Sequence, residues 1–287
     1  MKCSKLTKIG LTLGLSFLLV ACSSDDEGTK NKEVNLAYVE WDTEVASTHV
    51  VGQVLEDLGY DVTLTALDNG VMWKALSTGE VDGMVSAWLP KMHAPFVEKY
   101  KDDIVNLGEN LTGAKIGLVV PTYMDVNSIA DLTNEADQTI TAIEPGANMT
   151  KATENAYKDY PNLEEWTVLT SSGGAMTAAL KQAIEKKEEI IVTGWSPHWK
   201  FTAFDLKYLD DPKGIYGSED YIGTFARKGF KEDNPEAYSV LDNFHWTSED
   251  IENVMYDIME GTKPADAAKK WIRENEDKVA EWTKDVK

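Results

Sequence analysis

The sequence contains one short pattern twice. Residues 85–90 read VSAWLP and residues 192–197 read VTGWSP. The segments before the two copies also align, with Met72 over Met176 and Leu76 over Leu180. In both segments, β-branched runs that predict strands alternate with runs of helical periodicity, and this alternation is typical of parallel sheets with crossover helices. We therefore expect an α/β protein with two lobes built on one plan.

Two segments are expected to be the crossings between the lobes, residues 117–132 first and the glycine-rich residues 211–230 on the return. Residues 33–118 together with residues 224–287 are expected to form lobe I, and residues 119–223 are expected to form lobe II. Ligands of such sheets bind beyond the carboxyl ends of the strands. The duplicated pattern therefore predicts that both lobes direct the same strand end toward one shared cleft.

The N-terminus has the features of an export signal. Residues 1–21 are predicted to be a signal peptide, because three lysines precede the apolar run at residues 9–20. A helix of that run would rise only about 18 Å, too little to cross a bilayer. The run ends in LVAC, which resembles a lipobox with Cys22 as the lipidated residue, and the polar residues 22–32 are expected to be a flexible tether. The alternative is an ordinary secretory signal with a chance cysteine.

Charge and motifs exclude several functions. The chain has 28 Lys and Arg against 49 Asp and Glu, a net charge of −21, and it shows no basic stripe, so nucleic acid is not an expected partner. Its four histidines have no paired metal-ligand spacing. The sequence also lacks a nucleophile elbow, a Walker loop and a dinucleotide-binding glycine motif. We expect no metal and no cofactor, and nothing in the sequence supports an enzyme.

Three tryptophans follow predicted strands in both lobes. Trp41, Trp88 and Trp195 are each expected to lie just past a strand end. For any one of them, filling the core is the simpler interpretation, but three at matching ends favour a shared ligand. Indole faces attract cations, with about 0.5–2 kcal/mol per contact. A quaternary ammonium suits such a cage because it has no N–H group that needs an acceptor.

A zwitterionic ligand needs a second group of contacts for its anionic end. The turn EPGANM at residues 144–149 precedes a predicted helix that begins near Asn148. The first amides of a helix have no partner within the helix and suit a carboxylate. His93 follows Trp88 by five residues and could donate a further hydrogen bond, although a surface histidine in a loop is the simpler interpretation of its spacing.

The stretches that carry these features also carry a family resemblance. They are NLAYVEWDTEVAST, VMWKAL, SAWLPKMH, GLVVPTYMDVNSI, EPGANM, SSGGAMTAAL and TGWSPHW, and through them residues 34–284 resemble the glycine betaine-binding lipoproteins of osmoprotectant ABC importers of Gram-positive bacteria. The resemblance implies a two-lobed, periplasmic-binding-protein-like (type II) clamshell with its ligand in the cleft between the lobes. It also implies a monomer on the outer face of the cytoplasmic membrane that delivers its ligand to ABC permease and ATPase subunits.

The resemblance implies a role for each candidate residue. Trp41, Trp88 and Trp195 would enclose the trimethylammonium group, and His93 would hold the carboxylate with the backbone amides of two further residues. Those amides fall on Asn148 and Met149, where some relatives have Gly-Ile.

Several alternatives stay open at this point. Glycine betaine is the expected ligand, with proline betaine beside it, but carnitine, choline or another quaternary ammonium solute would suit the same cage. A surface lipoprotein enzyme that acts on betaine-like compounds, and an adhesion or structural lipoprotein, are the alternatives from other classes.

Overall fold

The computed structural model describes residues 32–217 and 219–286. The predicted signal peptide, the tether and the predicted lipidation site at Cys22 lie outside the described residues. No described helix has both the length and the apolar character needed to span a membrane.

The first part of the described chain is a β-α-β-α-β unit followed by a short helix. Its elements are β1 (Glu33–Tyr38), α1 (Asp42–Asp57), β2 (Asp61–Ala66), α2 (Asn69–Thr78), β3 (Gly83–Leu89) and α3 (Ala94–Tyr100). Strand β1 lies between β2 and β3 and is parallel to both. Every residue of β3 is buried, as expected for a strand covered on both faces.

The second part repeats this plan. Its elements are β5 (Thr139–Ala142), α4 (Asn148–Glu154), β6 (Thr167–Thr170), α5 (Gly173–Lys186) and β7 (Ile191–Ser196). Strand β5 lies between β6 and β7 and is parallel to both, as β1 is to β2 and β3. Ser172 caps α5 by accepting a hydrogen bond from the amide of Ala175. The two-lobed α/β architecture predicted from the repeat is confirmed, and each lobe has the same order of central and flanking strands.

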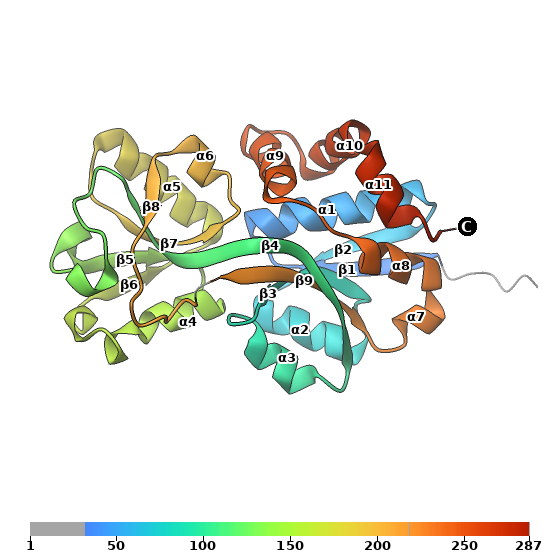
Figure 1. The fold of residues 1–287 in the computed structure, drawn as a ribbon, viewed down its shortest axis with the longest axis horizontal. Helices are drawn as coiled ribbons and strands as arrows, with labels where there is room; N and C mark the ends of the chain where they lie inside the picture. The colour runs from blue at the N-terminus through green and yellow to red at the C-terminus, as the bar shows by residue number, and fades with distance from the viewer. Residues whose placement is uncertain (1–31, 218, 287) are drawn as a thin grey trace, which may run out of the picture. The chain divides into compact units, whose positions relative to one another are not determined.

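Two antiparallel strands connect these parallel units, and the sequence did not predict them. Strand β4 (Ile104–Pro121) pairs with β9 (Asp220–Arg227) along its first part and with β7 and β8 (Leu206–Tyr208) along its second. Strand β9 also pairs with β3, which gives the order β2-β1-β3-β9-β4-β7-β5-β6. Figure 1 shows β4 running from one group of strands to the other. The sheet is therefore mixed rather than parallel throughout.

Strand pairing also bears on the lobe boundaries. Strand β4 changes partner from β9 to β7 between Ala114 and Lys115, and β9 pairs only with β3 and β4 among the described strands. The boundaries predicted at residues 118 and 223 stay predictions, and this pairing favours crossings a few residues earlier in both cases. Short 3₁₀ turns fill much of the connection from β4 to β5 and the region after α4, namely η1 (Ile129–Asp131), η2 (Glu135–Gln138), η3 (Ala156–Lys158) and η4 (Pro161–Leu163).

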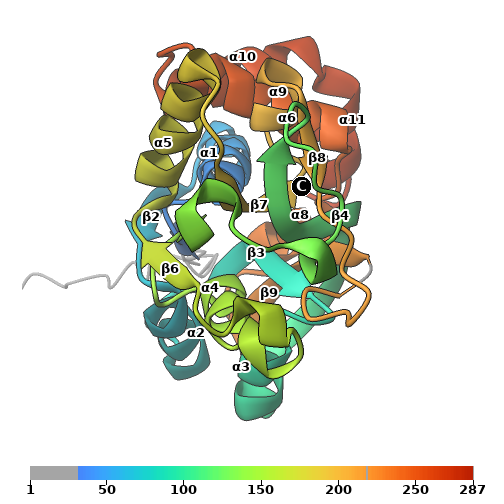
Figure 2. The same ribbon diagram turned by 90° about the vertical axis from the view of Figure 1, so that its left-hand side faces the viewer.

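The described residues from Phe230 onward form five helices that pack beside the first unit. They are α7 (Phe230–Asp233), α8 (Pro235–Asn243), α9 (Ser248–Met259), α10 (Pro264–Glu274) and α11 (Glu276–Thr283). In Figures 1 and 2 helices α9–α11 lie on the same side of the strands as α1. Thr247 and Asp250 form a capping box at the start of α9. Trp271 and Trp282 stack with ring centroids 5.5 Å apart, so these tryptophans serve the core.

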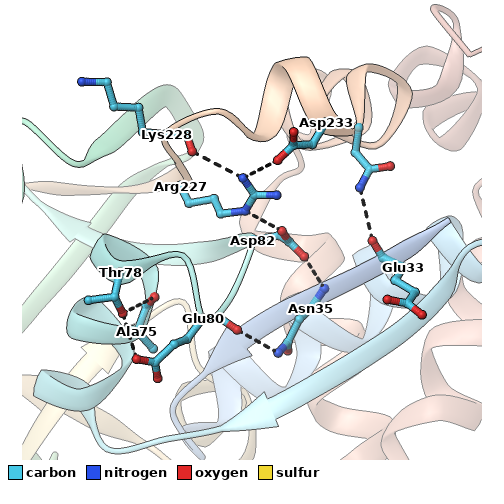
Figure 3. A network of polar contacts seen from close by, with 10 residues as sticks. Glu33, Asn35, Ala75, Thr78, Glu80, Asp82, Arg227, Lys228 and Asp233 are labelled. Atoms are coloured by element: carbon cyan, nitrogen blue, oxygen red, sulfur yellow. Dashed lines mark hydrogen bonds and ion pairs between the residues drawn. The ribbon is translucent and has the colours of Figure 1, made fainter. Parts of the chain in front are cut away.

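A polar network ties the end of β9 to the first unit (Figure 3). The guanidinium of Arg227 donates from Nε to Asp82 Oδ1 at 2.7 Å and also pairs with Asp233 at 2.7 Å. The second oxygen of Asp82 accepts from the backbone amide of Asn35 at 2.8 Å. Asp82 therefore joins the end of β9 to the start of β1, at the amino ends of the parallel strands β1 and β3.

Candidate functional site

A cavity lined by residues of both lobes lies between them. All six residues predicted for ligand contact line it, namely Trp41, Trp88, His93, Asn148, Met149 and Trp195. The first three come from the first unit and the others from the second, so segments far apart in sequence meet here. The remaining lining residues are Met92, Ile116, Ile143 and Ala147, which the sequence did not single out.

The fold positions the three tryptophans in two different ways. Trp88 and Trp195 are the next-to-last residues of β3 and β7. The prediction that these two tryptophans lie just past the strand ends is therefore wrong, because each lies inside its strand, one residue before the end. Trp41 follows β1 and is the residue before α1. The prolines of both duplicated motifs, Pro90 and Pro197, follow cis peptide bonds. All three indoles are buried, so each presents its surface to the cavity rather than to bulk solvent.

The indole N–H groups of the three rings have different environments. Trp88 Nε1 donates to Glu44 Oε1 at 2.8 Å, and Trp41 Nε1 donates to Glu144 Oε1 at 2.8 Å. The Nε1 of Trp195 is buried and has no hydrogen-bond partner among the described residues. Two of the three rings are therefore fixed by carboxylates, and the Trp41–Glu144 bond also links the two lobes.

His93 has a defined tautomer. Its Nδ1 lies 3.1 Å from the backbone amide of Trp88, which is a donor, so Nδ1 must accept and Nε2 must carry the proton. Burial lowers the pKa of His93 to about 3, so the imidazole is neutral near pH 7. Its ring stacks beside Trp41 at 6.2 Å between centroids and contacts Trp73 edge-on at 5.5 Å. This arrangement leaves a neutral N–H donor at the cavity.

The start of α4 forms another part of the cavity wall. Ala147 precedes the helix and has no side-chain group that could accept from its first amides. The side-chain amide of Asn148 donates to the carbonyl of Met92, a further link between the lobes. Inside α4, Thr150 Oγ1 donates to the carbonyl of Ile143 at 3.2 Å. The side chain of Asn148 is thus used between the lobes, while the first amides of α4 stay available for an anion.

A second set of contacts between the lobes was missed by sequence reasoning. Asp42, the first residue of α1, accepts from His198 Nε2 at 3.2 Å and from Trp199 Nε1 at 3.0 Å. Burial alone would raise the pKa of Asp42, but these donors lower it to about 2. Burial lowers the pKa of His198 to about 4, so a neutral imidazole donates to an ionised carboxylate. The repeated WxP motifs gave no signal for this pairing.

Behind Trp195 lies a buried lysine. Lys200 Nζ is 3.9 Å from the centroid of the Trp195 ring and has no hydrogen-bond partner among the described residues. Burial lowers the pKa of Lys200 to about 7, although the charge of Asp42 opposes the shift. Lys200 does not line the cavity. Groups of His, Cys, Asp and Glu that could hold a metal ion are absent from the described part of the chain.

A family profile decides what kind of protein this is. The profile of the substrate-binding domain of ABC-type glycine betaine transport systems matches residues 32–274. The chain belongs to this family. Its members are solute-binding domains and not enzymes, which agrees with the absence of catalytic motifs from the sequence.

Two solved structures of related proteins match most of this chain. A crystal structure of lactococcal OpuAC, closed and complexed with glycine betaine, has a TM-score of 0.85 at 52% identity, and the match covers 88% of this chain and 99% of that one. ProX of Borrelia burgdorferi, a glycine betaine/L-proline-binding protein, has a TM-score of 0.84 at 33% identity, over 88% of this chain and 96% of that one.

A curated relative is similar over a shorter span. The glycine betaine/carnitine transport binding protein GbuC of Listeria monocytogenes is 54% identical over 157 residues. That match covers 54% of this chain and 52% of the Listeria protein, so it spans about half of that relative's length.

Proposed function

We propose that this protein captures glycine betaine in the cavity between its lobes and delivers it to the membrane subunits of an ABC importer for osmoprotection. The observation that carries the proposal is the joint lining of one apolar cavity by three indole rings, contributed by both lobes, and by His93. The lactococcal relative supports it, because that protein is closed around glycine betaine.

The cationic end of the ligand would lie among Trp41, Trp88 and Trp195. A trimethylammonium group has no N–H donor, so it loses no hydrogen bond when it leaves water for an apolar cage. Ring faces then supply a negative potential, worth about 2 kcal/mol per contact in a desolvated site. Because the rings come from both lobes, neither lobe alone would surround the cation.

The carboxylate would lie at the other end of the cavity. The Nε2–H of His93 is a neutral donor there, and the backbone amides of Asn148 and Met149, which begin α4, line the same cavity. Backbone donors are unaffected by the Asn-Met pair that replaces Gly-Ile of some relatives. Charge-assisted hydrogen bonds of this kind are about twice as strong as neutral ones. This end would distinguish a betaine from choline, which lacks a carboxylate.

The decisive experiment removes one wall of the cage. Trp195→Ala should weaken glycine betaine binding at least tenfold, which corresponds to about 1.4 kcal/mol, while the melting curve of the ligand-free protein stays nearly unchanged. Trp271→Phe is the matched control, because Trp271 is buried in the helical tail away from the cavity. Calorimetric titration measures both variants. Normal betaine binding by Trp195→Ala would contradict the cage.

Carnitine is the second candidate ligand. The Listeria relative is named for both glycine betaine and carnitine, and carnitine carries the same two charged ends. Competition titrations with glycine betaine, proline betaine, carnitine and choline, followed by tryptophan fluorescence, rank these ligands directly. A protein whose fluorescence responds to none of them would have to be assigned to another class, such as an adhesion lipoprotein.

The location and partners form the last part of the proposal. We infer that lipidated Cys22 holds a monomer on the outer face of the cytoplasmic membrane of a Gram-positive cell, where it meets separate permease and ATPase subunits. The LVAC motif at residues 19–22 supports this. Cys22→Ala should release the protein from the membrane fraction, and retention of that variant would contradict the anchor.

A further inference from the structure

Glu44 is a buried carboxylate that is hydrogen-bonded to one ring of the proposed cage. It lies in the first turn of α1, its side chain is fully buried, and its Oε1 accepts the indole N–H of Trp88 at 2.8 Å. The other oxygen, Oε2, accepts from the hydroxyl of Thr43 at 2.6 Å. Both oxygens therefore accept hydrogen bonds from neutral groups, and Oε1 accepts from the ring that lines the cavity.

Among the described residues, no cation forms a hydrogen bond or ion pair with Glu44. The small cavity beside it is lined by neutral side chains, among them Ser86 and Asn110, and has no room for a water molecule. The charged group that acts on Glu44 is Asp42, a second anion, which already accepts from His198 and Trp199. Two other buried groups do not balance the charge of Glu44, because His93 is neutral and Lys200 interacts with Asp42 and Trp195.

An uncompensated carboxylate is a costly feature of a protein interior. The N-terminus of α1 offsets part of that cost through its dipole, but a glutamine would accept from Trp88 with its one oxygen and donate to the Thr43 hydroxyl with its amide, at no charge. Retaining a carboxylate here is understandable if a positive charge arrives on the other side of Trp88. The proposed ligand carries such a charge.

We propose that Glu44 is a positioning residue of the site that, through the indole N–H of Trp88, orients this ring and supplies the negative charge that makes the cavity prefer a cationic headgroup to a neutral one of the same shape. This inference rests on the proposed function. A carboxylate that accepts from the indole N–H increases the negative potential at the face of the ring. The charge of the carboxylate itself adds to the attraction of the ring for a cation. Glu144 makes the same kind of bond to Trp41, from a less buried position.

Burial also makes Glu44 responsive to a bound cation. It raises the pKa of Glu44 to about 7, although the hydrogen bonds from Thr43 and Trp88 act in the opposite direction. Near neutral pH the ligand-free protein is then a mixture of protonated and ionised forms. A cation in the cage favours the ionised form, so binding should release a proton from Glu44.

The test compares two ligands of the same shape. Glycine betaine has a quaternary nitrogen, and 3,3-dimethylbutanoate has a quaternary carbon in its place, so only the headgroup charge differs. Calorimetric and displacement titrations on wild type and Glu44→Gln at pH 8 should show betaine binding weakened on the order of tenfold by the substitution, the effect of about one pKa unit. Binding of the carbon analogue should stay within about twofold of wild type, because glutamine keeps an acceptor for Trp88.

The outcomes separate the inference from the function beneath it. Equal losses for both ligands would mean that Glu44 only supports the ring, and no loss for either would mean that it does not act on the site; both results overturn the inference. Failure of the wild-type protein to bind betaine would instead overturn the proposed function.

A second measurement needs no change at Glu44 and covers the case in which Glu44→Gln does not fold. Infrared difference spectra of the wild type at pH 7, with and without betaine, should show the loss of a protonated carboxyl band. Asp220→Asn is the matched control, because burial raises the pKa of Asp220 to about 6 and it is absent from the cavity lining. Betaine should remove the same band in that variant. A carboxyl band that betaine leaves unchanged in the wild type, or a band that is already absent from ligand-free Asp220→Asn, would contradict the inference.

Discussion

At the scale of the residue, the tautomer of His93 determines which ligands gain from it. Its Nδ1 accepts from the backbone of Trp88, so only Nε2–H can reach a ligand. Hydrogen bonds to charged groups contribute about 1.5–3 kcal/mol. We therefore expect His93→Ala to weaken glycine betaine binding at least tenfold while choline, which has no carboxylate, loses much less. Calorimetric titration with both ligands measures the ratio.

Two comparisons make this prediction specific. Because the pKa of His93 is about 3, its contribution should not change between pH 6 and 8 in the wild type. His245→Ala, at an exposed histidine, should bind both ligands as the wild type does. A parallel loss of betaine and choline in His93→Ala would show that His93 only fills space beside Trp41 and Trp73.

The candidate residues could be predicted from sequence where a pattern marked them, and not elsewhere. Trp88 and Trp195 occupy equivalent places in a duplicated motif, so their strand ends identified them. Glu44 and Glu144 could not be recognised, because 49 acidic residues offer no local reason to choose two. Their role depends on indole groups that reach them across the fold, and such pairings have no spacing in the chain.

At the scale of the element, helix α1 carries the contacts that hold the lobes together at its N-terminus. Asp42 accepts from His198 and Trp199 of lobe II. Asp42→Asn removes the charge that both donors address, so the closed form should lose stability relative to the open one. We expect glycine betaine to dissociate on the order of tenfold faster, in line with about 1.5 kcal/mol for a charged hydrogen bond. Stopped-flow tryptophan fluorescence measures the rate.

The opposite end of the same helix offers the control. Asp57 is exposed at the last turn of α1 and accepts from Gln53 within the helix, so Asp57→Asn should leave the dissociation rate unchanged. If Asp42→Asn also dissociates at the wild-type rate, then His198 and Trp199 do not stabilise closure.

The elements that sequence predicted best are those with local periodicity. The repeated β-α-β-α-β plan was visible because each strand and helix is short and continuous. Strands β4 and β9 were not predicted, because glycines interrupt both segments and their partners are antiparallel and distant. Residues 117–121 of β4 and all of β9 lie in the segments that were expected to be the two crossings. The register shifts between β4 and β9, at Gly108 among other places, show the same irregularity in the structure.

At the scale of the whole molecule, acid stability depends on buried groups whose pKa shifts have opposite effects. Burial lowers the pKa of His93 to about 3 and that of His198 to about 4, whereas the ordinary pKa of a histidine is 6.5. As the pH falls below 6.5, the unfolded chain therefore binds protons at these two histidines before the folded protein does. These histidines reduce stability as the pH falls below 6.5. Burial raises the pKa of Glu44 to about 7 and that of Asp220 to about 6, so the folded state takes up these protons first and gains stability over the same range.

The balance gives a stability profile that one substitution should change. The free energy of unfolding should vary little between about pH 6.5 and pH 4.5 and then fall steeply, because below pH 4.5 Glu44 no longer offsets the histidines and the pKa of Asp42, lowered to about 2, adds a further loss. Glu44→Gln should instead lose stability from pH 6.5 downward, by about 1.4 kcal/mol per pH unit relative to the wild type. Urea unfolding in half-unit steps of pH measures this difference, with the exposed Glu188→Gln as control. Parallel profiles for wild type and Glu44→Gln would show that folding does not raise the pKa of Glu44.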